Sequence, residues 1–96
     1  MGSGIHKTTL KNINDILNLL KEVGEIHIRG ISKALELNPF VVCNIINNYL
    51  IYFLEIRDIN QFGIRIKLVK LKAGLEYTVL EDVLNYVQLK NRIRSK

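Results

Sequence analysis

The chain has few residues with which to build a covalently linked or metal-held structure. Its 96 residues include one cysteine, Cys43, and two histidines, His6 and His27. A single thiol excludes a disulfide within the chain and a zinc site made of several thiolates, and these three residues lack metal-ligand spacing. A lone cysteine is also typical of a reducing compartment, so we expect a cytoplasmic protein without a metal or a cofactor.

Long apolar runs are also missing. No stretch approaches the roughly 20 consecutive apolar residues of a membrane-spanning helix, and we expect no membrane partner. Residues 1–7 lack the pattern of a signal peptide, and we expect them to form a flexible N-terminal lead-in. Neither a glycine-rich phosphate loop nor a nucleophile beside a base is visible, so we expect no enzyme activity.

Positive charge is the property that the chain has in excess. Fourteen lysines and arginines against nine acidic residues give a formal net charge of +5, and 48% of the residues are hydrophobic. This composition is typical of one globular domain. A small basic domain attracts polyanions, nucleic acid first and acidic membrane surfaces second. The plain alternative is a solvated basic surface.

Apolar periodicity predicts a helix in the first quarter of the chain. Thr8 or Thr9 is a suitable N-cap, and Gly24 is a suitable C-cap. Between them one apolar stripe recurs at helical spacing: Leu10, Ile13, Leu17 and Leu20. Residues 25–29 then alternate as a short strand, which Gly30 is expected to break.

Residues 31–46, ISKALELNPFVVCNII, indicate a short helix, a tight turn and a second helix. Asn38 is a strong N-cap, and Pro39 suits the first position of the second helix. Its core face is predicted to contain Val42, Ile45, Ile46 and Tyr49. Its other residues are left mostly outside the core: Phe40, Val41, Cys43, Asn44, Asn47 and Asn48.

Two strands are predicted next, at residues 54–59 and 64–72, around a loop at 60–63. Arg65 and Lys67 are expected on the outward face of the second strand. The apolar alternation changes phase at Leu68 and Val69, which predicts a bulge or a strand end there.

The last part of the chain, residues 73–93, is predicted to form one long helix followed by a basic tail from Lys90. Its apolar surface is too wide for a small monomer to cover, so we expect part of it to pack on a second subunit. The expected dimer contacts are Val79, Leu80, Val83, Tyr86 and Val87.

This order resembles the winged helix-turn-helix family over roughly residues 9–93. Leu37-Asn38-Pro39 resembles the turn before the recognition helix, and Val42 resembles its buried valine. Residues 54–72 resemble the wing, and residues 71–76, LKAGLE, resemble the motif that opens the following helix. Small regulators of the PadR, MarR and ArsR kinds, and compact archaeal virus or plasmid proteins, share this plan.

The resemblance implies an α+β fold, with a winged helix-turn-helix domain at residues 8–72 and a dimerisation helix at 73–96. It also implies sequence-specific binding of double-stranded DNA, most simply in transcriptional regulation. A two-fold dimer would place its recognition helices about 34 Å apart on a palindromic or pseudo-palindromic site.

On this interpretation, Asn44 and Asn47 bond to adenine, and Val41 or Phe40 contacts the thymine methyl group, which favours A·T-rich sites. Phosphate and wing contacts are expected from Ser32, Lys33, Asn60, Gln61, Arg65 and Lys67, with Arg29 as a further contributor. The plain alternatives are that the asparagines solvate a surface helix and that Phe40 packs on the turn. Cys43 is either a small helix residue or a redox sensor on that helix.

Two other functions fit the same residues. A plasmid-partition or DNA-organising protein would spread along DNA instead of occupying one site. A protein-interaction module would suit a recognition helix without charge, because no lysine or arginine occurs between Lys33 and Arg57.

Overall fold

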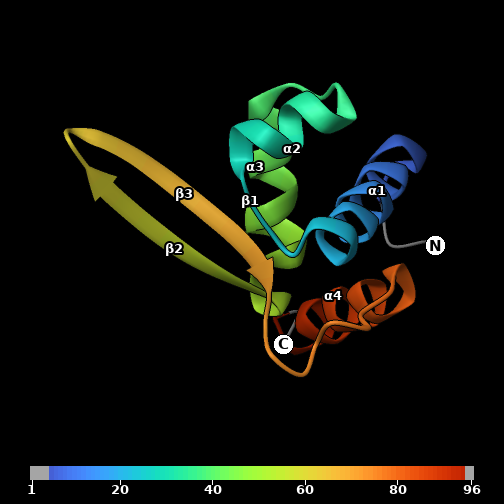
Figure 1. The fold of residues 1–96 in the computed structure, drawn as a ribbon. Helices are drawn as coiled ribbons and strands as arrows, with labels where there is room; N and C mark the ends of the chain where they lie inside the picture. The colour runs from blue at the N-terminus through green and yellow to red at the C-terminus, as the bar shows by residue number, and fades with distance from the viewer. Residues whose placement is uncertain (1–4, 95–96) are drawn as a thin grey trace.

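The computed structural model describes residues 5–94, which form four α-helices and a three-stranded antiparallel sheet. The elements run in the order α1 (Lys7–Val23), β1 (Glu25–His27), α2 (Ile28–Leu35), α3 (Pro39–Ile45), β2 (Leu54–Gln61), β3 (Ile64–Leu71) and α4 (Leu80–Arg94). The strand order is β1-β3-β2. In Figure 1 the helices form one body, from which the β2–β3 hairpin extends. This α+β arrangement, whose class was expected, is compatible with a winged helix-turn-helix.

The core lies where the helices meet the root of the hairpin. α1 contributes the largest share, because its stripe points inward from Ile13 to Leu20. The other core side chains come from all the remaining elements except β1: Ile31, Val42, Ile45, Ile46, Leu50, Phe53, Leu54, Val69, Leu71 and Val83. Burial of this apolar surface is the main force that holds the helices to the sheet.

The start of α1 differs from the prediction. The helix begins at Lys7, with His6 at the N-cap position and no capping bond from the His6 side chain. Thr8 and Thr9 therefore lie inside the first turn. Residues 1–4 of the expected lead-in lie outside the described residues. The end of the helix is confirmed, because Gly24 has φ 84° and its N–H donates to the carbonyl of Leu20 at 2.9 Å.

Gly30 has a different role from the predicted strand break. The strand ends earlier, at His27, and Gly30 lies within α2. A Cβ added at Gly30 would lie 2.7 Å from Nδ1 of His27 and 2.8 Å from Cγ1 of Ile26. Glycine is needed here because the end of β1 lies directly against the first turn of α2.

The predicted start of the helix after the turn, which is α3, is confirmed. Asn38 Oδ1 accepts a hydrogen bond from the Phe40 N–H at 2.8 Å, and Pro39 occupies the first turn. The helix continues differently, since a π-helical turn at Ile46–Leu50 and a 3₁₀ turn at Ile51–Phe53 follow α3. The predicted core residues Val42, Ile45 and Ile46 are buried, and Tyr49 packs against the core but is only half-buried. The wider π turn shifts the stripe so that Leu50 is also fully buried.

The hairpin is longer and more regular than predicted. Its register runs without interruption from Leu54↔Leu71 to Gln61↔Ile64, so the predicted bulge at Leu68 and Val69 is wrong. The loop contains only Phe62 and Gly63, whose φ angles of 53° and 76° are both positive, as in the tightest hairpin turns.

The last helix is shorter than predicted. Residues 72–79 form turns instead of helix, and α4 begins at Leu80. The Val79 N–H donates to Oδ2 of Asp82 at 3.1 Å, which satisfies a backbone donor at the start of the helix. The sequence signal that could have located this helix start is the pair Glu81 and Asp82, since acidic residues are favourable in the first turn of a helix. Ser95 and Lys96 of the basic tail lie outside the described residues.

Candidate nucleic-acid interface

One surface groove brings together residues that the sequence separates. Two hollows of about 460 and 540 Å³ adjoin at His27 and Arg29. One runs from there between the start of α2 and the outer half of β3, and the other runs over α2 to Pro39. We call this surface the basic groove, and its cationic residues are Arg29, Lys33, Arg65 and Lys67.

The four cations of the basic groove have no carboxylate partner within residues 5–92, where side chains are described. None of them forms an ion pair or a side-chain hydrogen bond there. By contrast, Arg57 donates twice to Glu25 at 3.0 Å, and Lys70 lies 3.9 Å from Glu55. Exposed cations that form no ion pair are available to bind phosphate.

The sheet geometry explains how β3 contributes to the groove. Side chains alternate along a strand, so Arg65 and Lys67 share a face with Val69 and Leu71, which are buried. The prediction that the two cations point outward is therefore corrected. They lie on the core-side face and stay exposed because the strand runs past the end of the core. The same direction brings them beside α2.

The exposed residues of α3 begin beside the basic groove. Pro39, its first residue, lines one of the two hollows. Phe40 is 81% exposed and Val41 37%, so the alternative in which Phe40 packs on the turn is wrong. Asn44 of α3 and Asn47 of the π turn are also exposed. These side chains are free to meet a partner.

Ser32 has a defined role within the turn. Its hydroxyl donates to the carbonyl of Leu37, and the Leu37 N–H donates to the carbonyl of Ser32 at 2.9 Å. Both bonds hold the chain where Glu36 adopts a left-handed conformation, with φ 55°. Ser32 lines the groove, but its hydroxyl hydrogen is already used.

The tip of the hairpin contains a residue that sequence reasoning missed. Asn60 and Gln61 are the last exposed residues of β2, and Phe62 after them is 98% exposed. A left-handed conformation costs a non-glycine residue roughly 1–2 kcal/mol, and asparagine tolerates it best. The signal that could have found Phe62 is its place before Gly63, where asparagine or aspartate is preferred.

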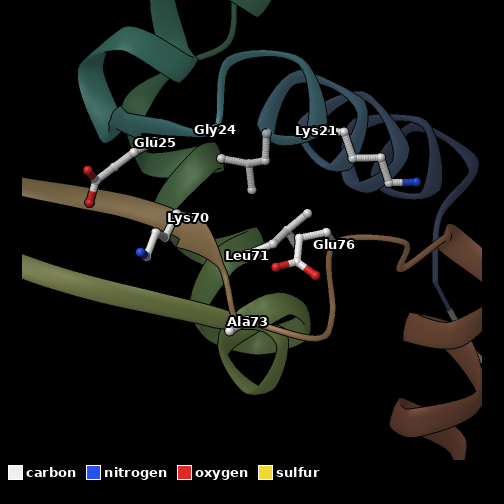
Figure 2. A pocket seen from close by; sticks show the side chains of 8 residues that line it. Lys21, Gly24, Glu25, Lys70, Leu71, Ala73 and Glu76 are labelled. Carbon is white, nitrogen blue, oxygen red and sulfur yellow. The ribbon is translucent and has the colours of Figure 1, made fainter.

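A separate hollow of about 400 Å³ lies between the end of α1 and the β3–α4 connection. Figure 2 shows Lys21 and Glu76 on one side of it and Glu25 and Lys70 on the other. Its carboxylates already have partners, since Glu76 accepts from the Gly74 N–H at 3.0 Å and Glu25 accepts from Arg57. The hydrogen bond from Arg57 lowers the pKa of Glu25. Both carboxylates of this hollow are therefore already satisfied within the chain.

The expected dimer contacts do not form one exposed surface. Val83 is fully buried in the core of its own chain and is corrected from an interface residue to a core residue. Leu80, Tyr86 and Val87 are half-buried against the same core, while Val79 is 46% exposed. An aromatic contact extends this region outward, because Tyr52, half exposed, stacks on Tyr86 with ring centroids 4.4 Å apart.

Comparison with known proteins adds no assignment to this geometry. No protein-family model, curated protein or solved structure matches the chain. In the described part of the chain, no cluster of three histidine, cysteine or acidic residues could hold a metal ion. None of the helices in residues 5–94 has the length and apolar character to cross a membrane. The basic groove is therefore the strongest candidate site.

Proposed function

We propose that this chain is a winged helix-turn-helix protein that binds double-stranded DNA, most simply as a transcriptional regulator. One observation carries the proposal: four cations from α2 and β3 line two adjoining hollows and form no ion pair among the described residues. Such a groove attracts the phosphate backbone and positions the protein on it.

In this proposal, α3 determines which bases the protein prefers. α3 enters the major groove, where Asn44 and Asn47 bond to adenine edges and Val41 contacts a thymine methyl group. The exposure of all three side chains supports this role. The proposal predicts an A·T-rich site. The basic groove supplies the affinity for DNA, and α3 supplies the preference for particular bases.

We also propose a two-fold homodimer that presents two recognition helices to a palindromic site. The support is the exposure of apolar residues on and near α4: Leu89 is 53% exposed, and Tyr52, which stacks on Tyr86, is 50% exposed. Sedimentation velocity at micromolar concentration checks this part. A monomer under these conditions overturns the dimer and leaves the DNA-binding proposal in place.

DNA binding is tested with a double variant, Arg65→Gln with Lys67→Gln. Fragments selected from random DNA supply the duplex, and fluorescence anisotropy measures the affinity over a range of salt concentrations. We expect the double variant to bind at least about tenfold more weakly at low salt, with a salt slope reduced by about 0.9 for each lost phosphate contact.

The matched control is Lys70→Gln. Lys70 lies on the same strand but on the opposite face, beside Glu55, so its removal changes the net charge without touching the groove. We expect its affinity to stay close to that of the unaltered protein. The double variant removes two charges and the control removes one, so an equal loss of binding free energy per charge removed would reduce the effect to net charge and overturn the proposed interface.

A protein-interaction function is the second candidate, because α3 contains no charged residue and exposes Phe40 and Val41. Changing Asn44 and Asn47 to alanine separates the two. Unchanged DNA affinity and site preference would show that this helix does not read DNA. Footprinting separates regulation from partition or DNA organisation, since a bounded site indicates the first and an extended ladder indicates spreading.

A further inference from the structure

The apex of the hairpin is shaped like a narrow wedge with an aromatic end. Two residues close it, and the last paired rung is Gln61↔Ile64. Phe62 is 98% exposed, and Ile64 beside it is 61% exposed. The fold gains almost no apolar burial from Phe62, whereas Ile64 is partly buried. The ring of Phe62 at the apex is therefore not explained by packing within this chain.

Phe62 is also a poor residue for the backbone that it occupies. Its φ of 53° lies in the left-handed region, which asparagine and glycine adopt far more easily than an aromatic residue. An asparagine before Gly63 would suit the turn better. The chain keeps a ring here that neither the turn nor the core requires, and such a local cost is typical of a binding element.

We propose that Phe62 inserts from the minor groove between two base pairs, partly unstacks them and bends the duplex. This inference rests on the proposed function and extends it to a specific contact. Proteins that bend DNA from the minor groove combine apolar wedges with asparagine, glutamine and basic side chains that read its edges. The apex has this combination, with Asn60 and Gln61 directly before the ring and Arg65 three residues after it.

The dimensions fit such an insertion. The ring of Phe62 is thin enough to enter the minor groove of B-DNA, which is about 6 Å wide, and bending the duplex toward the major groove makes room for the two strands behind the ring. Arg65 and Lys67 lie one and three rungs behind the terminal pair, where they meet the phosphates that border the groove. Pyrimidine–purine steps such as TA unstack most easily, so the wedge also favours A·T-rich DNA.

The test compares three proteins on an A·T-rich duplex that contains TA steps and bears a donor and an acceptor dye at its ends. Anisotropy gives the affinity, and energy transfer gives the bend. Phe62→Asn removes the ring and improves the turn, so its melting temperature is expected to equal or exceed that of the unaltered protein. Tyr77→Asn is the control, because Tyr77 is an 89% exposed aromatic residue outside the hairpin.

We expect the unaltered protein and Tyr77→Asn to bend the duplex, and Phe62→Asn to bind about tenfold more weakly and leave it nearly straight. If the unaltered protein binds without bending, or if Phe62→Asn bends equally, the wedge is overturned while the proposed function stands. If the unaltered protein does not bind duplex DNA, both fail. Loss by Phe62→Asn of binding to anionic phospholipid vesicles, with DNA bending intact, would assign the ring to a lipid surface and overturn the wedge.

Discussion

The two halves of the β2–β3 hairpin share one register but differ in everything that surrounds them. At the root, β3 pairs with both β1 and β2 and buries Val69 and Leu71 in the core. Beyond the His27↔Leu68 pair, β3 pairs with β2 alone. In this outer half, Ile66 is 37% exposed, and β3 supplies its two cations to the basic groove. The root stabilises the fold, and the outer half is available for binding.

This difference separates the part of the hairpin that the core needs from the part that the core leaves exposed. Side chains of the outer half contribute little to burial, so cations and an aromatic ring can be placed there at small cost to folding. The root must keep its apolar residues for the same reason that any core must. Variants in the two halves should therefore separate stability from binding.

The largest expected effect is at the root. Leu71→Ala removes a buried side chain, and we expect the free energy of unfolding to fall by about 2–5 kcal/mol. Ile64→Ala in the outer half of the same strand is the matched control, and we expect a loss below about 1 kcal/mol because this side chain is 61% exposed. Urea unfolding measures both. Similar losses in the two variants would show that the outer half packs as the root does.

A smaller effect is expected from Asp58→Asn in the outer half. Asp58 lies opposite Lys67 on the groove face, where its charge repels phosphate. Neutralising it should tighten DNA binding about threefold at low salt, from Coulomb's law at a separation of roughly 6 Å in water. Anisotropy at low and high salt measures the change. An affinity that stays the same at low salt would argue that DNA does not approach this rung.

The smallest effect is expected at the junction of the two halves, where Arg57 donates to Glu25. The hydrogen bond from Arg57 holds the pKa of Glu25 below its ordinary value of 4.5. A lowered pKa stabilises the folded protein above the unfolded-state pKa, and this contribution disappears as pH falls through the folded-state pKa. Glu25→Gln should therefore be slightly less stable near neutral pH, and the difference should vanish in acid.

Urea unfolding at a series of pH values measures this dependence. A difference between Glu25→Gln and the unaltered protein that is the same at neutral and at acidic pH would contradict an ion-pair origin. Binding to DNA should be unchanged, because Glu25 and Arg57 lie on the face of the sheet opposite the cations of the groove.

Much of the fold could be predicted from local patterns. Asn38 and Pro39 start a helix through their own backbone chemistry, and Gly24 ends one for the same reason. The features that were missed depend on distant parts of the chain. In the sequence, Gly30 indicates the end of a strand, because its closeness to the His27 ring is not visible there. The change of apolar phase along β3 indicates a bulge, because the sequence does not show where the core ends.

The candidate site was predictable only in part. Lys33, Arg65 and Lys67 were expected to meet DNA from their places beside the turn and in the wing, but their joint groove with Arg29 depends on how β3 passes α2. Val83 was misassigned because an apolar residue on a helix fits a dimer contact or the core of its own chain equally well.

The sequence by itself determined the order of the elements, the start of α3 and the excess of positive charge, because each depends on residue type or on neighbours in the chain. The tertiary structure alone decided which half of β3 is buried, where α4 begins to pack and which cations share a groove. Burial and shared surfaces depend on contacts between residues far apart in sequence, and no local period records those contacts.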